Sequence, residues 1–324
     1  MATAADIARA AALLGAGGLV AFPTETVYGL GADAANAAAV ARVYAVKGRP
    51  GDHPCIVHLA RAAQIDAWAI DIPAAARLLS GRFWPGPLTL VLRRAPHVLD
   101  AVTGGQDTVA LRVPAHPVAQ ALLAAFGGGV VGPSANRFGR VSPTTAAHVR
   151  DELGEAVDCV LEGGASDVGI ESTVVDLSGP RPRLLRPGGI DAARIEAVLD
   201  EPLVRGATDA PRAPGMLESH YAPGTPVMTV RDDLVVELAR TLAEGGQRVA
   251  VLAIGRPAPL SSNIVWRSLA TDPAGYAQAL YGALRELDRA GCDVIVAELP
   301  PDAPGWEAVR DRLRRASTNR ADPG

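Results

Sequence analysis

The sequence predicts an α/β protein with a largely mixed sheet, followed by a second, smaller α/β unit. Short apolar strands alternate with helical runs over the first part of the chain, a segment rich in proline and glycine interrupts them, and the alternation then resumes. Hydrophobic residues make up 48% of the 324 residues and charged residues 20%, which is the balance of a globular protein. Two domains are therefore the default expectation.

Residues 1–199 contain the longer series of elements. Gly17 and Gly18 stop the first helix, and a buried strand follows. The predicted helices are 6–16, 35–46, 73–83, 117–126, 144–153 and 191–199. The predicted strands are 19–22, 55–59, 88–92, 109–113, 129–132, 159–162, 172–177 and 183–186. Continuous and alternating apolar runs both occur among these strands, so the sheet should be mixed.

Residues 200–226 are predicted to be a linker, because they contain five prolines and three glycines and have little periodicity. Met216, His220 and Tyr221 in its middle are unusual for a plain spacer. Residues 227–317 are predicted to form the second α/β unit, and residues 318–324 are predicted to be a tail. Its predicted strands are 227–230, 248–254, 263–266 and 293–299, and its predicted helices are 232–244, 274–289 and 304–315.

Composition excludes several classes of protein. The net charge of -4 gives no global attraction to nucleic acid, so a site for a polyanion must be a local basic pocket. Cys55, Cys159 and Cys292 are far apart, which argues against a zinc or disulfide framework and fits a reducing, cytoplasmic compartment. The N-terminal run contains Asp6 and Arg9 and predicts a helix, not a signal peptide. No stretch approaches the ~20 apolar residues of a membrane span.

The chain has 31 lysines and arginines, of which Lys47 is the single lysine. Lysine is a compact point charge, whereas arginine is a planar fork. Chance in a biased composition would explain one lysine. The neighbouring residues suggest a function instead. Arg49 follows two residues later, on a turn that glycine and proline make rigid, so Lys47 and Arg49 could bind phosphates as a pair.

Five segments combine hydroxyl or charged side chains with glycine or proline at predicted strand ends, where open α/β sheets usually bind ligands. They are residues 22–34, 47–59, 108–114, 132–149 and 169–190. Each alone could be ordinary structure: His58 could be a satisfied core histidine, and the buried Arg112 could pair with a carboxylate of the protein or of a ligand. Together, the cations Lys47, Arg49, Arg112 and Arg186 suit a triphosphate plus a carboxylate.

Known catalytic motifs do not explain these segments. The chain lacks GxxxxGK[ST] and GxSxG motifs and shows no convincing Ser/His/Asp or Cys/His arrangement. Ser142 is a plausible N-cap at a helix start, where backbone amides can hold an anion. We therefore expect chemistry by positioning and charge neutralisation, without a covalent enzyme intermediate.

The motifs FPTETVYGLG, KGRP, CIVHL, FWPGPLTLVL, TVALRVP, GPSAN…SPTT, GIESTVVDL and LLRPGGI occur in this order. This series resembles the YrdC-like threonylcarbamoyl-AMP synthase family, and APGMLESHYAP with the second unit resembles its long two-domain form. The resemblance implies a YrdC-like twisted mixed sheet with flanking helices and a cleft, plus a smaller Rossmann-like C-terminal domain. It also implies a nucleotidyltransferase that forms threonylcarbamoyl-AMP and pyrophosphate from L-threonine, bicarbonate and ATP, for tRNA N6-threonylcarbamoyladenosine.

The resemblance assigns roles to individual residues. The threonine pocket would comprise Thr24, Thr26, His58, Arg112, Gly132 and Ser172. ATP would be held by Lys47, Arg49, His53, Thr108, Ser134, Ser142, Arg186 and Tyr221. Lys47 and Arg49 would also be catalytic, by neutralising the reacting phosphates, and Tyr221 would make the linker a lid. The family usually has Asn where this chain has His53, which leaves the role of that residue open and makes it pH-dependent.

The resemblance also implies a cofactor and partners. Mg2+ would bridge the phosphates of ATP, held mainly by nucleotide and water, with no protein ligand assigned. Downstream threonylcarbamoyl-transferase proteins acting on tRNA would be partners, with weak RNA binding and no membrane association. Two alternatives remain, a carbamoyltransferase and a YrdC-fold RNA-binding module. The absence of zinc-finger and acylphosphatase-like segments disfavours the first, and the acidic balance with 4% aromatics disfavours the second.

Overall fold

A computed structural model describes residues 1–206, 210–215, 220–258 and 263–317. The chain divides into two compact units, the first comprising Met1–Phe138 and Pro143–Met216 and the second Gly139–Ser142 and Leu217–Gly324. The division after Met216 falls inside the predicted linker. The second unit also includes four residues that lie far from the rest of it in the sequence. None of the helices in the described part of the chain is long and apolar enough to cross a membrane.

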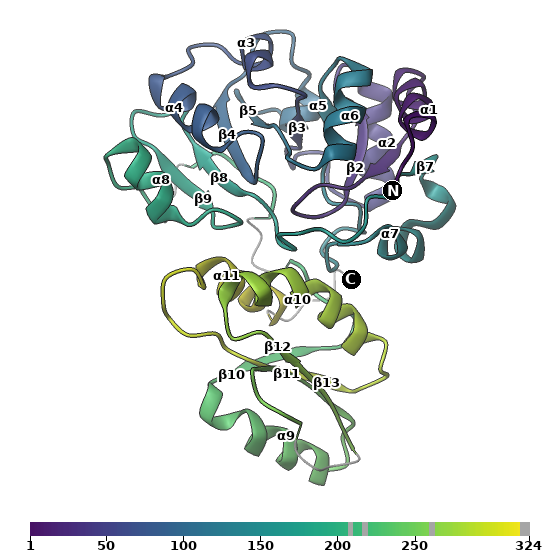
Figure 1. Cartoon of the computed structure of the whole chain (residues 1–324), viewed down its shortest axis with the longest axis vertical. Helices are drawn as coiled ribbons and strands as arrows, with labels where there is room; N and C mark the ends of the chain where they lie inside the picture. The colour runs from purple at the N-terminus through teal and green to yellow at the C-terminus, as the bar shows by residue number, and fades with distance from the viewer. Residues whose placement is uncertain (207–209, 216–219, 259–262, 318–324) are drawn as a thin grey trace. The chain divides into compact units, whose positions relative to one another are not determined.

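One sheet of nine strands organises the described part of the first unit, in the order β7-β1-β2-β6-β3-β5-β4-β8-β9. Most of these strands are labelled in Figure 1. Its strands are Val20–Phe22 (β1), Gly29–Asp33 (β2), Ile56–His58 (β3), Leu88–Arg93 (β4), Thr108–Arg112 (β5), Val130–Val131 (β6), Cys159–Val160 (β7), Thr173–Asp176 (β8) and Arg183–Arg186 (β9). The pairs β1–β7, β3–β5 and β4–β8 are parallel and the others antiparallel. The predicted mixed α/β sheet is therefore confirmed.

Helices cover this sheet through two apolar clusters. The helices are Ala4–Gly15 (α1), Ala37–Lys47 (α2), Ile65–Trp68 (α3), Ala74–Phe83 (α4), Asp100–Thr103 (α5), Pro117–Phe126 (α6), Ala146–Leu153 (α7) and Ala192–Leu199 (α8). Buried residues of α2, α4 and α8, among them Val43, Leu79 and Ile195, pack in the larger cluster. Leu14 of α1 and Leu122 of α6 belong to the other cluster, with residues of β1 and β6.

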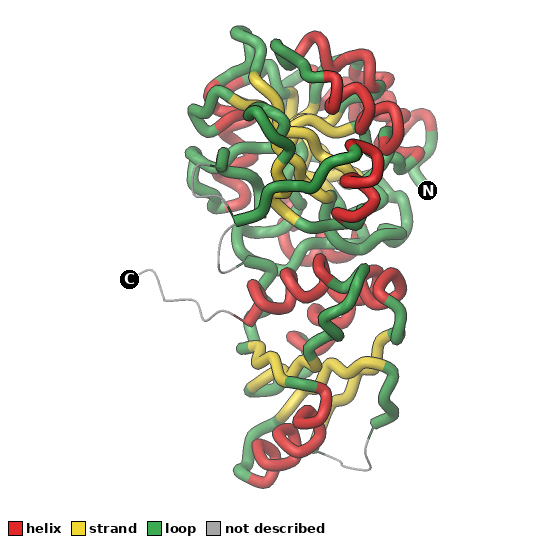
Figure 2. The backbone as a smooth tube through the Cα atoms, turned by 90° about the vertical axis from the view of Figure 1, so that its left-hand side faces the viewer, coloured by secondary structure: helices red, strands yellow, loops and turns green. Residues whose placement is uncertain are grey.

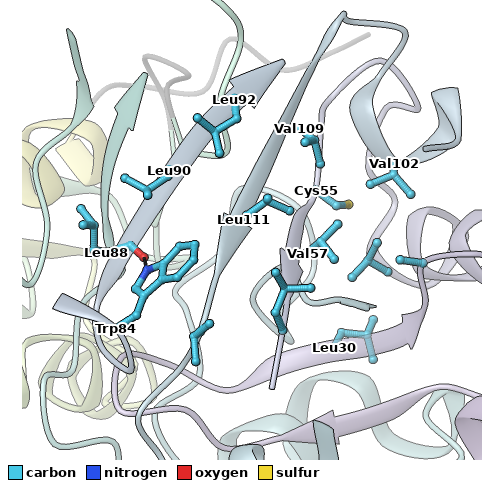
Figure 3. Packing of buried hydrophobic residues seen from close by; sticks show 14 of the residues in the cluster. Leu30, Cys55, Val57, Trp84, Leu88, Leu90, Leu92, Val102, Val109 and Leu111 are labelled. Atoms are coloured by element: carbon cyan, nitrogen blue, oxygen red, sulfur yellow. Dashed lines mark hydrogen bonds between the residues drawn. The ribbon is translucent and has the colours of Figure 1, made fainter. Parts of the chain in front are cut away.

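The alternation of side chains along the central strands separates the core from the site. Leu90 of β4, Leu111 of β5 and Val57 of β3 point into the larger cluster, where the indole nitrogen of Trp84 donates a 2.7 Å hydrogen bond to the carbonyl of Leu88 (Figure 3). Neighbouring residues along a strand point to opposite faces. His58 and Arg112 are paired in register on β3 and β5, so both lie on the face opposite this core.

The segment after β1 is a hairpin, which the sequence pattern did not predict. Residues Gly29–Asp33 form β2, antiparallel to β1, with Val20 opposite Gly31. A Cβ at Gly31 would lie 2.9 Å from the carbonyl oxygen of Val20 and 3.0 Å from Phe22. Glycine therefore permits the close approach of the two strands. Residues 23–28, which include Thr24, Glu25 and Thr26, lie in the loop that joins them.

The second unit has a parallel sheet of four strands among its described residues, in the order β10-β13-β11-β12. Its strands are Val227–Val230 (β10), Val249–Ile254 (β11), Ile264–Leu269 (β12) and Val294–Glu298 (β13). Its helices are Val235–Glu244 (α9), Pro273–Asp288 (α10) and Glu307–Ser317 (α11), with α9 on one face of the sheet and α10 and α11 on the other (Figures 1 and 2). This is the smaller Rossmann-like α/β domain that the sequence predicted.

Candidate functional site

A buried ion pair anchors the first group of predicted site residues. Arg112 Nη2 lies 2.6 Å from Glu25 Oε1, and both side chains are buried. Arg112 Nη1 donates to Thr26 Oγ1 at 2.9 Å, and Arg112 Nε donates to the carbonyl of Gly86 at 3.2 Å. The second oxygen of Glu25 accepts from the amide of Ala115. The partner of Arg112 in this structure is thus a carboxylate of the protein, which holds the guanidinium rigidly in place.

The hydroxyl groups of the loop 23–28 continue this network. Thr24 Oγ1 donates to the carbonyl of Val27 at 2.6 Å and lies 2.7 Å from Thr26 Oγ1. Because the single proton of Thr24 is used in the first bond, Thr26 donates to Thr24 while it accepts from Arg112. The predicted residues Thr24, Thr26 and Arg112 are therefore joined directly.

His58 lies beside Arg112 as a neutral, buried imidazole. Burial, and then the positive charge of Arg112, lower the pKa of His58 to about 3. His58 Nδ1 is buried and has no hydrogen-bond partner among the described residues. A Cβ at Gly132 would lie 2.7 Å from this nitrogen, so only glycine can pack this closely against the ring. The backbone of Ile56 and Val130 also interacts with the imidazole and partly offsets the lowering of its pKa.

The depressed pKa of His58 predicts a specific acid sensitivity. The unfolded chain binds the proton at the ordinary pKa of 6.5 and the folded protein only near 3. Neutral His58 therefore contributes stability that is complete above about pH 6.5 and is lost as the pH falls toward 3. We expect the free energy of unfolding of His58→Asn to fall less steeply between these values than that of the wild type, as measured by urea denaturation. Parallel profiles for the two proteins would contradict this.

Lys47 ends helix α2 and is almost fully buried. Its ammonium donates to the carbonyl oxygens of Ser134 and Asn136, the latter at 2.6 Å. Burial, and then the charge of Arg49, lower the pKa of Lys47 to about 7. An anionic phosphate nearby would raise this pKa again and favour the charged form. The single lysine thus holds the loop of the GPSAN motif in place.

Arg49 and His53 lie on the turn that follows. Arg49 Nη2 donates to the carbonyl of Pro54 at 2.7 Å, and its guanidinium lies 5.8 Å from the ring centroid of Tyr44. Within the described part of the chain, the buried Nε of Arg49 has no hydrogen-bond partner. The ring of His53 packs edge-to-face against Phe138, and burial, then Arg49, lower its pKa. This turn therefore gathers one fixed cation, Arg49, and one mostly neutral imidazole, His53.

A third group joins Ser172, Arg186 and a residue the sequence did not single out, Thr89. Arg186 Nη2 donates to the carbonyl and to Oγ of Ser172, at 2.8 and 3.1 Å, and Ser172 Oγ lies 2.7 Å from Thr89 Oγ1. Arg186 Nη1 donates to the carbonyl of Pro214 at 2.8 Å. Within the first unit, the predicted linker thus reaches this group.

The remaining predicted site residues lie in different parts of the fold. Thr108 lies on β5, four residues before Arg112 and on the same face of the sheet. Ser142 and Tyr221 belong to the second unit, where Tyr221 is buried between the ring of Tyr281 and the guanidinium of Arg312. The structure brings the other predicted residues into the three groups above, all within the first unit.

A backbone contact links the first two of these groups. Gly29, beside the loop 23–28, pairs with Ser134, which binds Lys47. Arg112 binds Thr26 on one side and the carbonyl of Gly86 on the other. Sequence reasoning missed the pairing role of Glu25, whose only signal was a carboxylate in a cluster of hydroxyls. It also missed Thr89, whose polar side chain is buried inside an apolar strand.

The first unit is an α/β fold that gathers fixed cations, hydroxyls and a neutral histidine at strand ends, an arrangement typical of enzymes that act on small anionic ligands. Two family models match the chain: one described as telomere recombination over residues 12–188, and one described as threonylcarbamoyl-AMP synthase, C-terminal domain, over residues 190–318. The chain belongs to the threonylcarbamoyl-AMP synthase family.

Individual relatives support this assignment along the whole chain. The chain is 43% identical to the threonylcarbamoyl-AMP synthase of Pyrococcus abyssi over 319 residues, covering 95% of this chain and 93% of the relative. It is 42% identical to that of Bacillus subtilis over 328 residues, covering 97% and 94%. The crystal structure of P. abyssi Sua5 complexed with L-threonine superposes with a TM-score of 0.91 at 41% identity, covering 97% of this chain and 95% of that one.

Proposed function

We propose that this protein is an L-threonylcarbamoyladenylate synthase, which forms threonylcarbamoyl-AMP and pyrophosphate from L-threonine, bicarbonate and ATP for tRNA modification. One observation carries the proposal at the site: neutral, buried His58 lies beside Arg112, whose guanidinium is fixed by Glu25. A fixed cation next to a neutral acceptor suits a zwitterionic amino acid, with its carboxylate near Arg112 and a donor group near His58.

The first step would take place on the threonine side. The amine of threonine adds to carbon dioxide derived from bicarbonate, forms a C–N bond and releases a proton, which gives a carbamate. Thr24, Thr26 and Arg112 are fixed before substrate arrives, so they would orient the amino acid with little reorganisation. The backbone at Gly132, which packs against the ring of His58, would close this pocket.

The second step would take place on the nucleotide side. A carbamate oxygen attacks the α-phosphorus of ATP in line, the bond to the bridging oxygen breaks, and pyrophosphate leaves. Lys47 and Arg49 would neutralise the charge on the phosphates, because such transfers depend on positioning and electrostatics. Ser134, Arg186 and Thr108 would hold the nucleotide. The assignment of Ser142 and Tyr221 to ATP comes from the motifs alone.

Mg2+ would accompany ATP and help to neutralise its phosphates. Among the residues that the structure describes, no group of three or more His, Cys, Asp or Glu side chains could hold a metal ion. In the proposed complex, phosphate and water oxygens would supply most of its ligands. The product would be passed to threonylcarbamoyl-transferase proteins that act on tRNA.

The proposal is tested by incubating the protein with ATP, bicarbonate and labelled L-threonine, and by measuring pyrophosphate and the labelled adenylate. We expect both products in equal amounts, and neither when threonine or bicarbonate is omitted. Equal pyrophosphate release with serine, or without any amino acid, would refute the substrate assignment. Salt-sensitive RNA binding without ATP turnover would favour the RNA-binding module instead.

A further inference from the structure

Thr89 lies in a row of buried polar side chains that crosses neighbouring strands of the first unit. Strands β3, β5 and β4 are adjacent in the sheet, and His58 of β3 is paired with Arg112 of β5. Leu90 of β4 is paired with Leu111 of β5 in antiparallel register. The next pair along these two strands is Thr89 with Arg112, so their side chains are neighbours on the face opposite the core.

Thr89 also joins the strand on its other side, through a hydrogen bond to Ser172. It is paired with Val174 of β8, and Ser172 lies two residues before Val174. Ser172 Oγ is 2.7 Å from Thr89 Oγ1 and accepts from Arg186 Nη2 at 3.1 Å. None of the side chains of Thr89, Ser172, Arg112 and Arg186 belongs to a residue that is more than 3% exposed. The hydroxyl of Thr89 is thus buried between Arg112 and the pair of Ser172 and Arg186.

The hydroxyl groups of Thr89 and Ser172 have one more proton than their own hydrogen bond uses. Each carries one proton, and the bond between them takes one of the two, whichever residue donates. Arg186 is a donor to Ser172 and cannot accept the other proton. In the described part of the chain, neither hydroxyl has a further partner that could accept it. A buried donor without an acceptor is unfavourable, so the pair is suited to an acceptor atom of a ligand beside Arg112.

The stability of β4 does not call for a hydroxyl group at this position. The other residues of the strand are apolar up to Arg93 at its end, and Val91 is the next residue on the same face as Thr89. A valine at position 89 would be equally suited to a buried strand and would not bury a hydroxyl group. The requirement for the hydroxyl therefore comes from Ser172 and the site.

We propose that Thr89 is a positioning residue for the amino-acid substrate: its hydrogen bond to Ser172 directs the spare proton of the pair to the carboxylate of threonine. This inference rests on the proposed function, in which Ser172 and Arg112 belong to the threonine pocket. A carboxylate can accept from a hydroxyl and from a guanidinium at the same time, and hydrogen bonds to a charged acceptor are stronger than neutral ones. Thr89 itself acts through Ser172.

The test measures threonine binding by the full-length protein and by Thr89→Val, which removes the hydroxyl and keeps the branched shape. Isothermal titration gives the dissociation constant for L-threonine and, separately, for a non-hydrolysable ATP analogue. We expect the constant for threonine to rise about tenfold, because a hydrogen bond to a charged group is weakened, and the constant for the analogue to stay within about twofold. Thr89→Ser keeps the hydroxyl and should bind threonine nearly as the wild type does.

A double variant shows whether Thr89 acts through Ser172. Ser172→Ala alone should weaken threonine binding about tenfold, because the hydroxyl that Thr89 orients is removed. Thr89→Val/Ser172→Ala should then bind threonine as Ser172→Ala does, because residues that act as one unit are not additive. Additive losses, about 100-fold in the double variant, would show that the two hydroxyls act independently and would overturn the inference.

Two further variants separate positioning from folding. Thr103→Val makes the same exchange at a buried threonine of α5, whose hydroxyl donates to the carbonyl of Asp100, and should bind threonine as the wild type does. Thr89→Ala removes the hydroxyl with a smaller side chain and takes the place of Thr89→Val if valine prevents folding. The stoichiometry of each titration gives the fraction of folded protein, so the dissociation constant refers to folded molecules.

The outcomes distinguish the two proposals. Unchanged threonine affinity in Thr89→Val and Thr89→Ala, or equal weakening of threonine and of the ATP analogue, would overturn the inference. A wild type that binds threonine but makes no threonylcarbamoyl-AMP would refute the proposed function, and the ratio of dissociation constants would still test positioning. A wild type that does not bind threonine would refute both.

Discussion

Lys47→Arg is expected to lower kcat/KM at least about 100-fold, the scale of losing one donor that stabilises developing charge. The ammonium of Lys47 is enclosed by the carbonyls of Ser134 and Asn136, and a planar guanidinium cannot take the same place. The melting temperature should also fall, because these contacts tie the loop of the GPSAN motif to the end of α2. Steady-state pyrophosphate release and thermal unfolding would measure the two effects.

The control for this change is Arg9→Lys, a conservative exchange at an exposed position of α1 that pairs with Asp6. Exposed ion pairs contribute little, so activity and melting temperature should both match the wild type. Turnover of Lys47→Arg within about twofold of the wild type would contradict the charge-neutralising role, since known single-donor losses are much larger. Lys47 would then serve the fold alone, by holding the carbonyls of Ser134 and Asn136.

Arg112→Met is expected to destabilise the fold by about 3–5 kcal/mol, the usual result of leaving one member of a buried ion pair uncompensated. Glu25 would remain buried, with the amide of Ala115 as the partner of its second oxygen. The same change should abolish measurable threonine binding, because the cation expected to contact its carboxylate is gone. Urea denaturation and titration with threonine would measure the two losses.

The double variant Arg112→Met/Glu25→Gln separates these losses. Glutamine removes the buried charge and still accepts from the amide of Ala115, so most of the stability should return. Threonine binding should not return. A double variant with wild-type affinity for threonine would show that Arg112 stabilises the fold only, through Glu25.

Local patterns in the sequence were sufficient for most of the elements. Apolar alternation predicted β4 and β5 to within a residue, and the stretch from Pro117 predicted all of α6. The pattern did not predict β2, because its sequence GLGAD has two glycines and no β-branched residue. The signal that was needed was the partner strand β1, which a local pattern does not contain.

Contacts between distant residues were beyond sequence reasoning. The residues of the ion pair between Glu25 and Arg112 are 87 positions apart, and those of the bond between Thr89 and Ser172 are 83 apart. Sheet topology brings such pairs together. A separation of 87 or 83 residues is not the period of a helix or a strand, so it does not predict a contact. The membership of residues 139–142 in the second unit is a similar case, because they lie between two motifs of the first.

The burial of the single lysine has a consequence for proteolysis. A lysine-specific protease can cut this chain at one peptide bond only, between Lys47 and Gly48. Lys47 is 4% exposed, so the protease can reach this bond only when the C-terminal end of α2 unfolds locally. The rate of that single cut therefore reports how often the turn at Lys47 opens, and bound nucleotide should slow it in proportion to occupancy.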